Sequence, residues 1–131
     1  MLQRFIFLFS IILVSNVQAQ TRTIAFYNVE NLFDTLDHPV KNDNEFLPDG
    51  SYEWTSERYQ AKLKRINQVI DSLQVPMILG LCEIENKQVV QDLVDAGSMK
   101  STHGVVHFES LDQRGIDNAI VFDKTVLTLE D

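Results

Sequence analysis

The spacing of apolar residues changes between the period of a strand and that of a helix along the chain. Residues 23–29 are β-branched and aromatic, with apolar groups on both faces, which predicts a strand covered on both sides. Residues 55–73 show helical spacing and begin at Thr55, a good N-cap. The apolar stripe of this predicted helix consists of Tyr59, Leu63, Ile66, Ile70 and Leu73.

The rest of the chain continues this alternation. Residues 77–82 are a short apolar run typical of a buried strand, and Asn86 can cap a second helix that stops at Gly97. Residues 104–108, 118–122 and 125–129 predict three more strands, the last two joined by a turn at 123–124. Residues 34–52 are rich in turn formers, and an irregular segment of this length is often functional. The order of elements predicts an α/β fold with some antiparallel pairing.

The N-terminal residues have the composition of a targeting segment. Arg4 precedes an apolar run over residues 5–14, and Val17-Gln18-Ala19 supplies a suitable cleavage site. The run is too short to cross a bilayer, and a buried N-terminal helix is the alternative. We therefore expect residues 1–19 to be a secretory signal and residues 20–131 to be exported, periplasmic or extracellular, without a membrane anchor after removal of the signal.

Charge and cysteine content exclude several classes of protein. The 131 residues carry a formal net charge of −8, which opposes binding of nucleic acid by bulk electrostatics. A single cysteine excludes a disulfide scaffold and a multi-cysteine zinc site. Cys82 lies in an apolar run, so we expect it to be buried and inert. Lys62, Lys64 and Arg65 lie off the apolar stripe of the first helix and predict a solvated face more readily than a nucleic-acid patch.

Polar side chains follow the predicted strands, where α/β folds usually place their sites. Asn28 and Glu30 end the first strand, and Glu83 follows the apolar run 77–82. A carboxylate in that position requires a cation or hydrogen-bond donors, and Mg²⁺ prefers such oxygen ligands. Arg114, in the loop 112–117, has the planar donor geometry that suits phosphate.

Each of these groups also has a structural interpretation. Asn28 and Glu30 could be turn caps at a strand end, and Glu83 could be an acid of the second helix's first turn. Residues 112–117 could form an ordinary hairpin loop. The histidines at 38, 103 and 107 have no ligand-like neighbour at helical spacing, so we interpret them as structural or exposed.

Four segments together resemble the endonuclease/exonuclease/phosphatase family, and more closely its exported bacterial branch. The segments are FYNVENLFD (26–34), WTSERY (54–59), LGLCEIEN (79–86) and DQRGID (112–117), in the order that the family has them. The resemblance runs from Thr23 to Asp131. It implies the deoxyribonuclease-I-like fold, a four-layer α/β/β/α sandwich, of which residues 20–131 would be the N-terminal portion.

The same resemblance implies Mg²⁺- or Mn²⁺-dependent phosphoester hydrolysis. By this match, Glu83 is the principal metal-binding acid and Asn28 a metal or phosphate contact, so these two are the predicted catalytic residues. Glu30 stands where some members carry a second acidic metal ligand. Arg114 matches a subgroup motif and is the predicted substrate-binding residue.

The segments that normally follow in the family, with a histidine, a Gly-Asp-x-Asn and a Ser-Asp-His, do not occur in this sequence. We therefore expect weak or no activity from this chain alone, and an uncovered apolar surface. The first expectation for its lineage is an exported, metal-dependent phosphodiester hydrolase, an endonuclease acting on DNA or RNA. The alternatives are a phosphatase, a small-molecule or lipid phosphodiesterase of the same fold, or a non-catalytic remnant or binding module.

Overall fold

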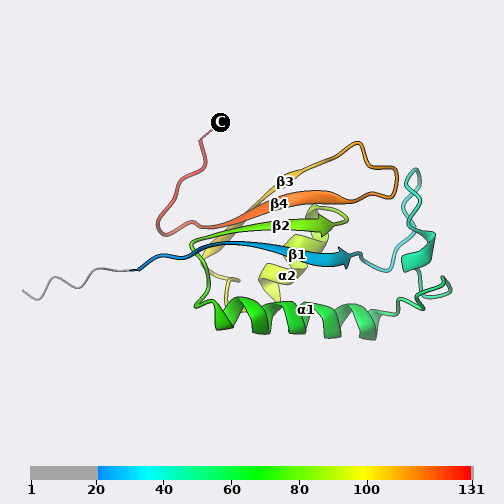
Figure 1. Ribbon diagram of the computed structural model, residues 1–131, viewed down its shortest axis with the longest axis horizontal. Helices are drawn as coiled ribbons and strands as arrows, with labels where there is room; N and C mark the ends of the chain where they lie inside the picture. Colours follow the sequence, from blue (N-terminus) through cyan, green and yellow to red (C-terminus); the bar gives the residue numbers. More distant parts are fainter. Residues whose placement is uncertain (1–20, 131) are drawn as a thin grey trace, which may run out of the picture.

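The computed structural model describes residues 21–130, which form one mixed sheet of four strands with two helices packed against it (Figure 1). The predicted α/β class is therefore confirmed. In chain order the elements are β1 (Ile24–Leu32), the short 3-10 helix η1 (Asn44–Phe46), α1 (Ser56–Ser72), β2 (Ile78–Ile84), α2 (Lys87–Asp95), β3 (His103–Phe108) and β4 (Asp117–Asp123).

The order of strands across the sheet is β1-β2-β4-β3. β1 and β2 are parallel, joined through α1, while β4 is antiparallel to both β2 and β3. The carboxyl ends of β1 and β2 therefore lie at the same edge as the loop between β3 and β4. The segment that follows β1 lies at that edge too (Figure 1).

Both predicted helix caps are present. The Thr55 side chain accepts a hydrogen bond from the backbone N–H of Arg58 at 3.4 Å, and Asn86 accepts one from Val89 at 3.0 Å. These bonds satisfy N–H groups that have no partner within the helix. α2 ends at Asp95, before Gly97, whose missing side chain leaves room for Asn67: a Cβ at Gly97 would lie 1.9 Å from the Asn67 Oδ1.

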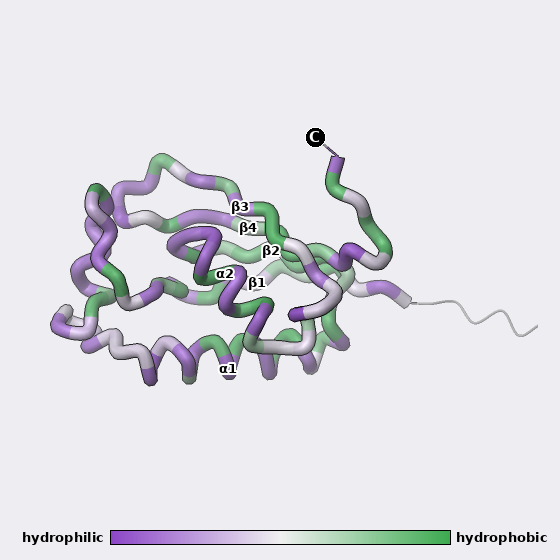
Figure 2. Tube along the Cα trace, turned by 180° about the vertical axis from the view of Figure 1, so that it is seen from behind, coloured by the Kyte–Doolittle hydropathy of each residue, from purple (hydrophilic) through white to green (hydrophobic). Residues whose placement is uncertain are grey.

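The core lies between the helices and one face of the sheet. Figure 2 views the molecule from the side opposite to Figure 1, and in this view α2 lies in front of the sheet. The predicted stripe of α1 is buried except for Leu73, which is 36% exposed because the helix has already ended there. The Tyr59 hydroxyl donates to Asp92 Oδ2 at 2.8 Å and ties α1 to α2. The other core side chains include Leu79, Leu81, Ile84, Val89, Val90, Leu93, Val94 and Val121.

The opposite face of the sheet corrects the expectation that the first strand is covered on both sides. Within residues 21–130, no helix packs on that face. Phe26 is 86% exposed and Ile24 60% exposed, and both point away from the helices. The Phe26 ring lies directly over Gly80 of β2, where a Cβ would come within 2.4 Å of the ring. The expected uncovered apolar surface is thus present, and it also includes Phe108 and Ile120.

The prediction of a strand over residues 125–129 is wrong. Asp123 Oδ1 accepts hydrogen bonds from the backbone N–H and hydroxyl of Thr125, at 2.8 and 2.6 Å, and this turn ends the strand. A hairpin with β4 is also impossible because β2 and β3 already occupy both edges of β4. Val126 and Leu129 are consequently exposed.

Cys82 also departs from expectation, since it is partly exposed rather than buried. It lies on the open face of β2, and its Sγ contacts the backbone oxygen of Tyr27 at 3.9 Å. No helix in the part of the chain described has the length and apolar character needed to span a membrane. The predicted secretory signal, residues 1–19, lies outside the described residues.

Candidate functional site

Two irregular strand ends lie side by side at the carboxyl edge of the sheet. The pairing of β1 with β2 shifts between Asn28 and Leu32, and the pairing of β2 with β4 shifts between Cys82 and Ile84. Glu30, Asn31 and Glu83 lie in these irregularities with positive φ angles of 55°, 65° and 62°. Strained backbone and bulges often accompany functional sites, because they direct side chains away from the sheet's regular alternation.

The bulges bring the predicted pair Asn28 and Glu83 into contact. Asn28 Nδ2 donates to Glu83 Oε1 at 2.8 Å, and Asn28 Oδ1 accepts the backbone N–H of Glu30 at 2.8 Å. Because one end of the amide faces a carboxylate and the other a donor, its orientation is determined. Asn28 therefore holds the Glu83 carboxylate in place. Its direct contact with metal or phosphate stays a prediction.

Lys62 of α1 contacts the backbone of the same β1 bulge. Its Nζ donates to the backbone oxygens of Glu30 and Asn31, at 2.5 and 3.4 Å. Burial lowers the pKa of Lys62, and Glu30 and Glu83 oppose that shift as nearby negative charges. Lys64 and Arg65 are exposed, as expected for a solvated face, whereas Lys62 is only partly exposed.

A cleft opens in front of these groups. A cavity of about 420 Å³ is lined by Glu30, Asn31, Phe46, Tyr52, Trp54, Arg58, Lys62 and Glu83. A neighbouring cavity of about 380 Å³ shares Asn31, Phe46 and Tyr52 with it and includes Arg114. The predicted metal ligands Glu30 and Glu83 thus line one cavity, and the predicted phosphate ligand lines the next.

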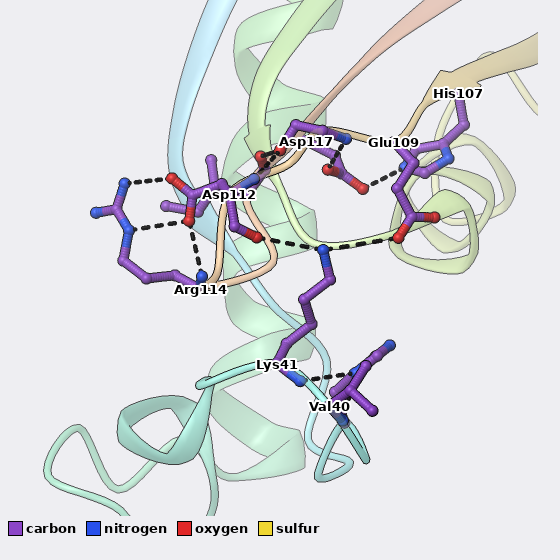
Figure 3. A network of polar contacts seen from close by, with 10 residues as sticks. Val40, Lys41, His107, Glu109, Asp112, Arg114 and Asp117 are labelled. Carbon is purple, nitrogen blue, oxygen red and sulfur yellow. Dashed lines mark hydrogen bonds and ion pairs between the residues drawn. The ribbon is translucent and has the colours of Figure 1, made fainter.

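Arg114 is held by its own loop. Its Nη2 and Nε donate to the carboxylate of Asp112 at 2.9 and 3.2 Å, and this contact keeps the pKa of Asp112 below its usual range. Lys41 joins this loop to the segment after β1, through the Glu109 carboxylate at 3.6 Å and the Asp112 backbone oxygen at 3.2 Å (Figure 3). The Arg114 side chain is nevertheless 66% exposed, so a substrate can reach it.

Asp117, at the start of β4, anchors the base of the same loop. Its buried carboxylate accepts the backbone N–H of Ser110 at 2.7 Å and contacts His107 Nε2 at 2.9 Å. His103 lies within 3.1 Å of the Pro76 backbone oxygen, and His38 Nδ1 accepts the backbone N–H of Lys41. The interpretation of the histidines as structural agrees with these contacts.

Glu85 lies behind the site and is 7% exposed. Burial raises its pKa to about 7, and the negative charges of Asp34 and Asp43 add to the shift. A hydrogen bond from the Asp34 backbone N–H to Glu85 Oε2, 2.7 Å long, opposes it. Glu85 therefore secures the segment that follows β1, and it does not line the cleft.

Within residues 21–130, no group of three or more His, Cys, Asp or Glu side chains converges as a metal cage. The donors present still suit a hard cation that binds through one or two carboxylates and keeps waters and substrate oxygens as its other ligands. Asn28 occupies one oxygen of Glu83, while Glu30 lines the same cavity. The chemistry of this donor set fits Mg²⁺ or Mn²⁺ and does not resemble a closed structural metal site.

Sequence reasoning missed Lys62 and the aromatic wall of the cleft. Lys62 follows Tyr59 by three positions, which places it at the edge of the buried stripe of α1, so its spacing could have indicated partial burial. Tyr52 and Phe46 gave no such signal, because they lie in the irregular segment after β1. Only the folded loop places them in the same cavity as Glu83.

Comparison with known proteins agrees with this architecture. Residues 23–131 match a family model described as the Endonuclease/Exonuclease/phosphatase family. No curated protein and no solved structure matches the chain.

Proposed function

The chain belongs to the endonuclease/exonuclease/phosphatase family, and from that membership we propose that it is a metal-dependent phosphodiester hydrolase, an exported endonuclease acting on DNA or RNA. The observation that carries this proposal is the contact between Asn28 and Glu83 on two paired bulges, beside Glu30. An oriented carboxylate at the mouth of a cleft is the group that a phosphate-bound cation requires.

In this proposal Glu83 is the principal ligand of Mg²⁺ or Mn²⁺, and Glu30 supplies a second carboxylate. The bound cation would supply charge stabilisation at the phosphoryl oxygens. Asn28 holds Glu83 in position, while Lys62 holds the bulge that carries Glu30. Arg114 would exchange part of its contact with Asp112 for a phosphate oxygen, since a guanidinium offers five donors.

The finer fold assignment is part of the same proposal. We infer that residues 20–131 correspond to the N-terminal portion of a four-layer α/β/β/α sandwich. The exposure of Phe26, Ile24 and Phe108 on one face of the sheet supports this, because such a face is where a second sheet packs in a sandwich.

The test is hydrolysis by the full chain with Mg²⁺, Mn²⁺ or EDTA. Nicking of supercoiled DNA and cleavage of bis(p-nitrophenyl) phosphate would be measured for the wild type, for Glu83→Gln, and for Glu57→Gln as an exposed carboxylate outside the cleft. We expect weak metal-dependent cleavage that Glu83→Gln removes and Glu57→Gln retains. Cleavage that survives EDTA or Glu83→Gln would refute the metal site, and no cleavage by the wild type would favour a non-catalytic binding module.

The net charge of −8 favours a second candidate, a phosphatase or a small-molecule or lipid phosphodiesterase of the same fold. A strongly acidic surface repels a long polyanion more than it repels a small phosphoester. The same assay distinguishes the two, because this candidate predicts metal-dependent cleavage of p-nitrophenyl phosphate or its diester without nicking of DNA.

A further inference from the structure

Three aromatic rings form a column that runs from the core into the cleft. Phe33 is fully buried and stacks on Phe46 with ring centroids 4.1 Å apart and planes within 4°. Phe46 in turn stacks on Tyr52 at 4.9 Å and 23°. Tyr52 ends the column and is 52% exposed.

The column is rigidly supported. Trp54 packs edge-on against Phe46, with centroids 6.4 Å apart, and its Nε1 donates to the Phe33 backbone oxygen at 2.9 Å. Arg58 donates through Nη1 to the backbone oxygens of Tyr52 and Glu53, which fastens the end of the loop to α1. An aromatic ring held in this way loses little conformational entropy when a ligand stacks on it.

The end of the column shares its cavity with the proposed metal site. Tyr52, Phe46 and Trp54 line the 420 Å³ cavity together with Glu30 and Glu83. The positive charges of Arg58 and Lys62 lie on the same cavity, and Lys62 Nζ is 5.6 Å from the centroid of Trp54. A ligand that contacts the aromatic rings and the proposed metal site together would carry a flat ring close to a phosphate.

We propose that Tyr52 is a stacking subsite for an unpaired nucleobase adjacent to the phosphate at Glu83. This inference rests on the proposed function and specifies its substrate as a nucleotide unit with a free base. A base within a duplex has both faces covered by its neighbours, so it offers no face to Tyr52. Stacking also provides attraction that the net charge of the chain does not.

The test compares binding of two single-stranded oligomers of equal length in EDTA, where metal-dependent hydrolysis cannot proceed. One is a fluorescein-labelled deoxythymidine 12-mer, and the other is the same backbone with base-free tetrahydrofuran residues. By fluorescence anisotropy we expect the oligomer with bases to bind about tenfold more tightly, the range of a single base–aromatic stack. Tyr52→Phe should keep this preference and Tyr52→Leu should abolish it.

The Leu substitution keeps an apolar side chain against Phe46, and thermal unfolding followed by circular dichroism would show that both variants are folded. Equal affinity of wild type for the two oligomers, binding of neither, or an unchanged preference in Tyr52→Leu would each overturn the inference. Duplex of the same sequence should bind no better than the base-free strand.

The failure of this inference is distinguishable from that of the proposed function. In our scheme, hydrolysis of the base-free oligomer with Mg²⁺ requires Glu83 and does not require Tyr52. If that hydrolysis is lost in Glu83→Gln while wild type shows no base preference, the hydrolase stands and the stacking subsite is refuted. If the wild type prefers the oligomer with bases but hydrolyses neither oligomer, the stacking subsite stands and the proposed hydrolase function is refuted.

Discussion

The side chains of Asn28 and Glu83 meet at the carboxyl edge of the sheet, with Nδ2 2.8 Å from Oε1, although 55 positions separate them in the chain. The contact depends on irregular pairing at both strand ends, and it leaves Glu83 at the mouth of the cleft.

Replacing Asn28 with Ala should weaken hydrolysis without unfolding the protein. The Glu83 carboxylate would lose its only side-chain donor within residues 21–130, and a hydrogen bond to a charged group contributes about 1.5–3 kcal/mol. We expect kcat/KM to fall about tenfold to a hundredfold. Asn28→Asp should lower it further, because a second carboxylate would face Glu83. Steady-state kinetics with Mg²⁺ would measure both, and full activity in Asn28→Asp would contradict the role of the amide.

Lys62→Met should loosen the β1 bulge. The variant keeps most of the apolar stem but loses the ammonium that donates to the Glu30 and Asn31 backbone oxygens. We expect a loss of about 1 kcal/mol in unfolding free energy, together with reduced Mg²⁺-dependent activity. Urea denaturation would measure the first effect. Lys64→Met, at an exposed position of the same helix, is the matched control. Equal losses of unfolding free energy and activity in the two variants would show that the contacts of Lys62 with the bulge contribute to neither.

Glu85 should make stability fall as pH rises from about 4.5 to about 7. Its pKa in the folded protein is raised to about 7 from an ordinary value of 4.5, so the folded state holds the proton more tightly than the unfolded state does. The stability that this group contributes is complete below pH 4.5 and is lost as pH rises through 7. The size is on the order of 3 kcal/mol, from about 1.4 kcal/mol per unit of pKa.

Glu85→Gln removes this pH-dependent contribution to stability, because glutamine still accepts the backbone N–H of Asp34 but does not titrate. Urea denaturation at pH 5 and pH 8 should therefore show a smaller change for Glu85→Gln than for wild type. Glu57→Gln, at an exposed site in the first turn of α1, should behave as wild type. Identical pH dependence in all three proteins would rule out Glu85 as the source.

Asp117→Ala should destabilise the loop that carries Arg114. The buried carboxylate holds the Ser110 backbone N–H and His107 Nε2, and its removal leaves both without their partner. We expect a loss of about 3 kcal/mol in unfolding free energy and faster proteolysis between β3 and β4. Asp112→Ala removes an exposed contact with Arg114 in the same loop and should change stability little. A proteolysis rate equal to wild type in Asp117→Ala would contradict the anchoring role.

Local pattern was sufficient to identify most elements. The apolar stripe of α1 and the caps Thr55 and Asn86 depend on neighbours within four residues, so they could be read from the chain directly. The strand ends that carry Asn28, Glu30 and Glu83 could also be located, since polar groups directly after an apolar run require hydrogen-bond partners or a cation. The family resemblance then assigned these groups a common chemistry.

The tertiary structure decided which groups meet and which surfaces are covered. Residues 125–129 have a strand-like sequence, yet β4 has no free edge, and a sequence pattern does not contain strand order. The open face at Phe26, the partial burial of Lys62 and the position of Tyr52 in the same cavity as Glu83 depend likewise on contacts between distant parts of the chain. Side-chain periodicity determines which face of an element is apolar. Which neighbour covers that face is settled only when distant segments pack together.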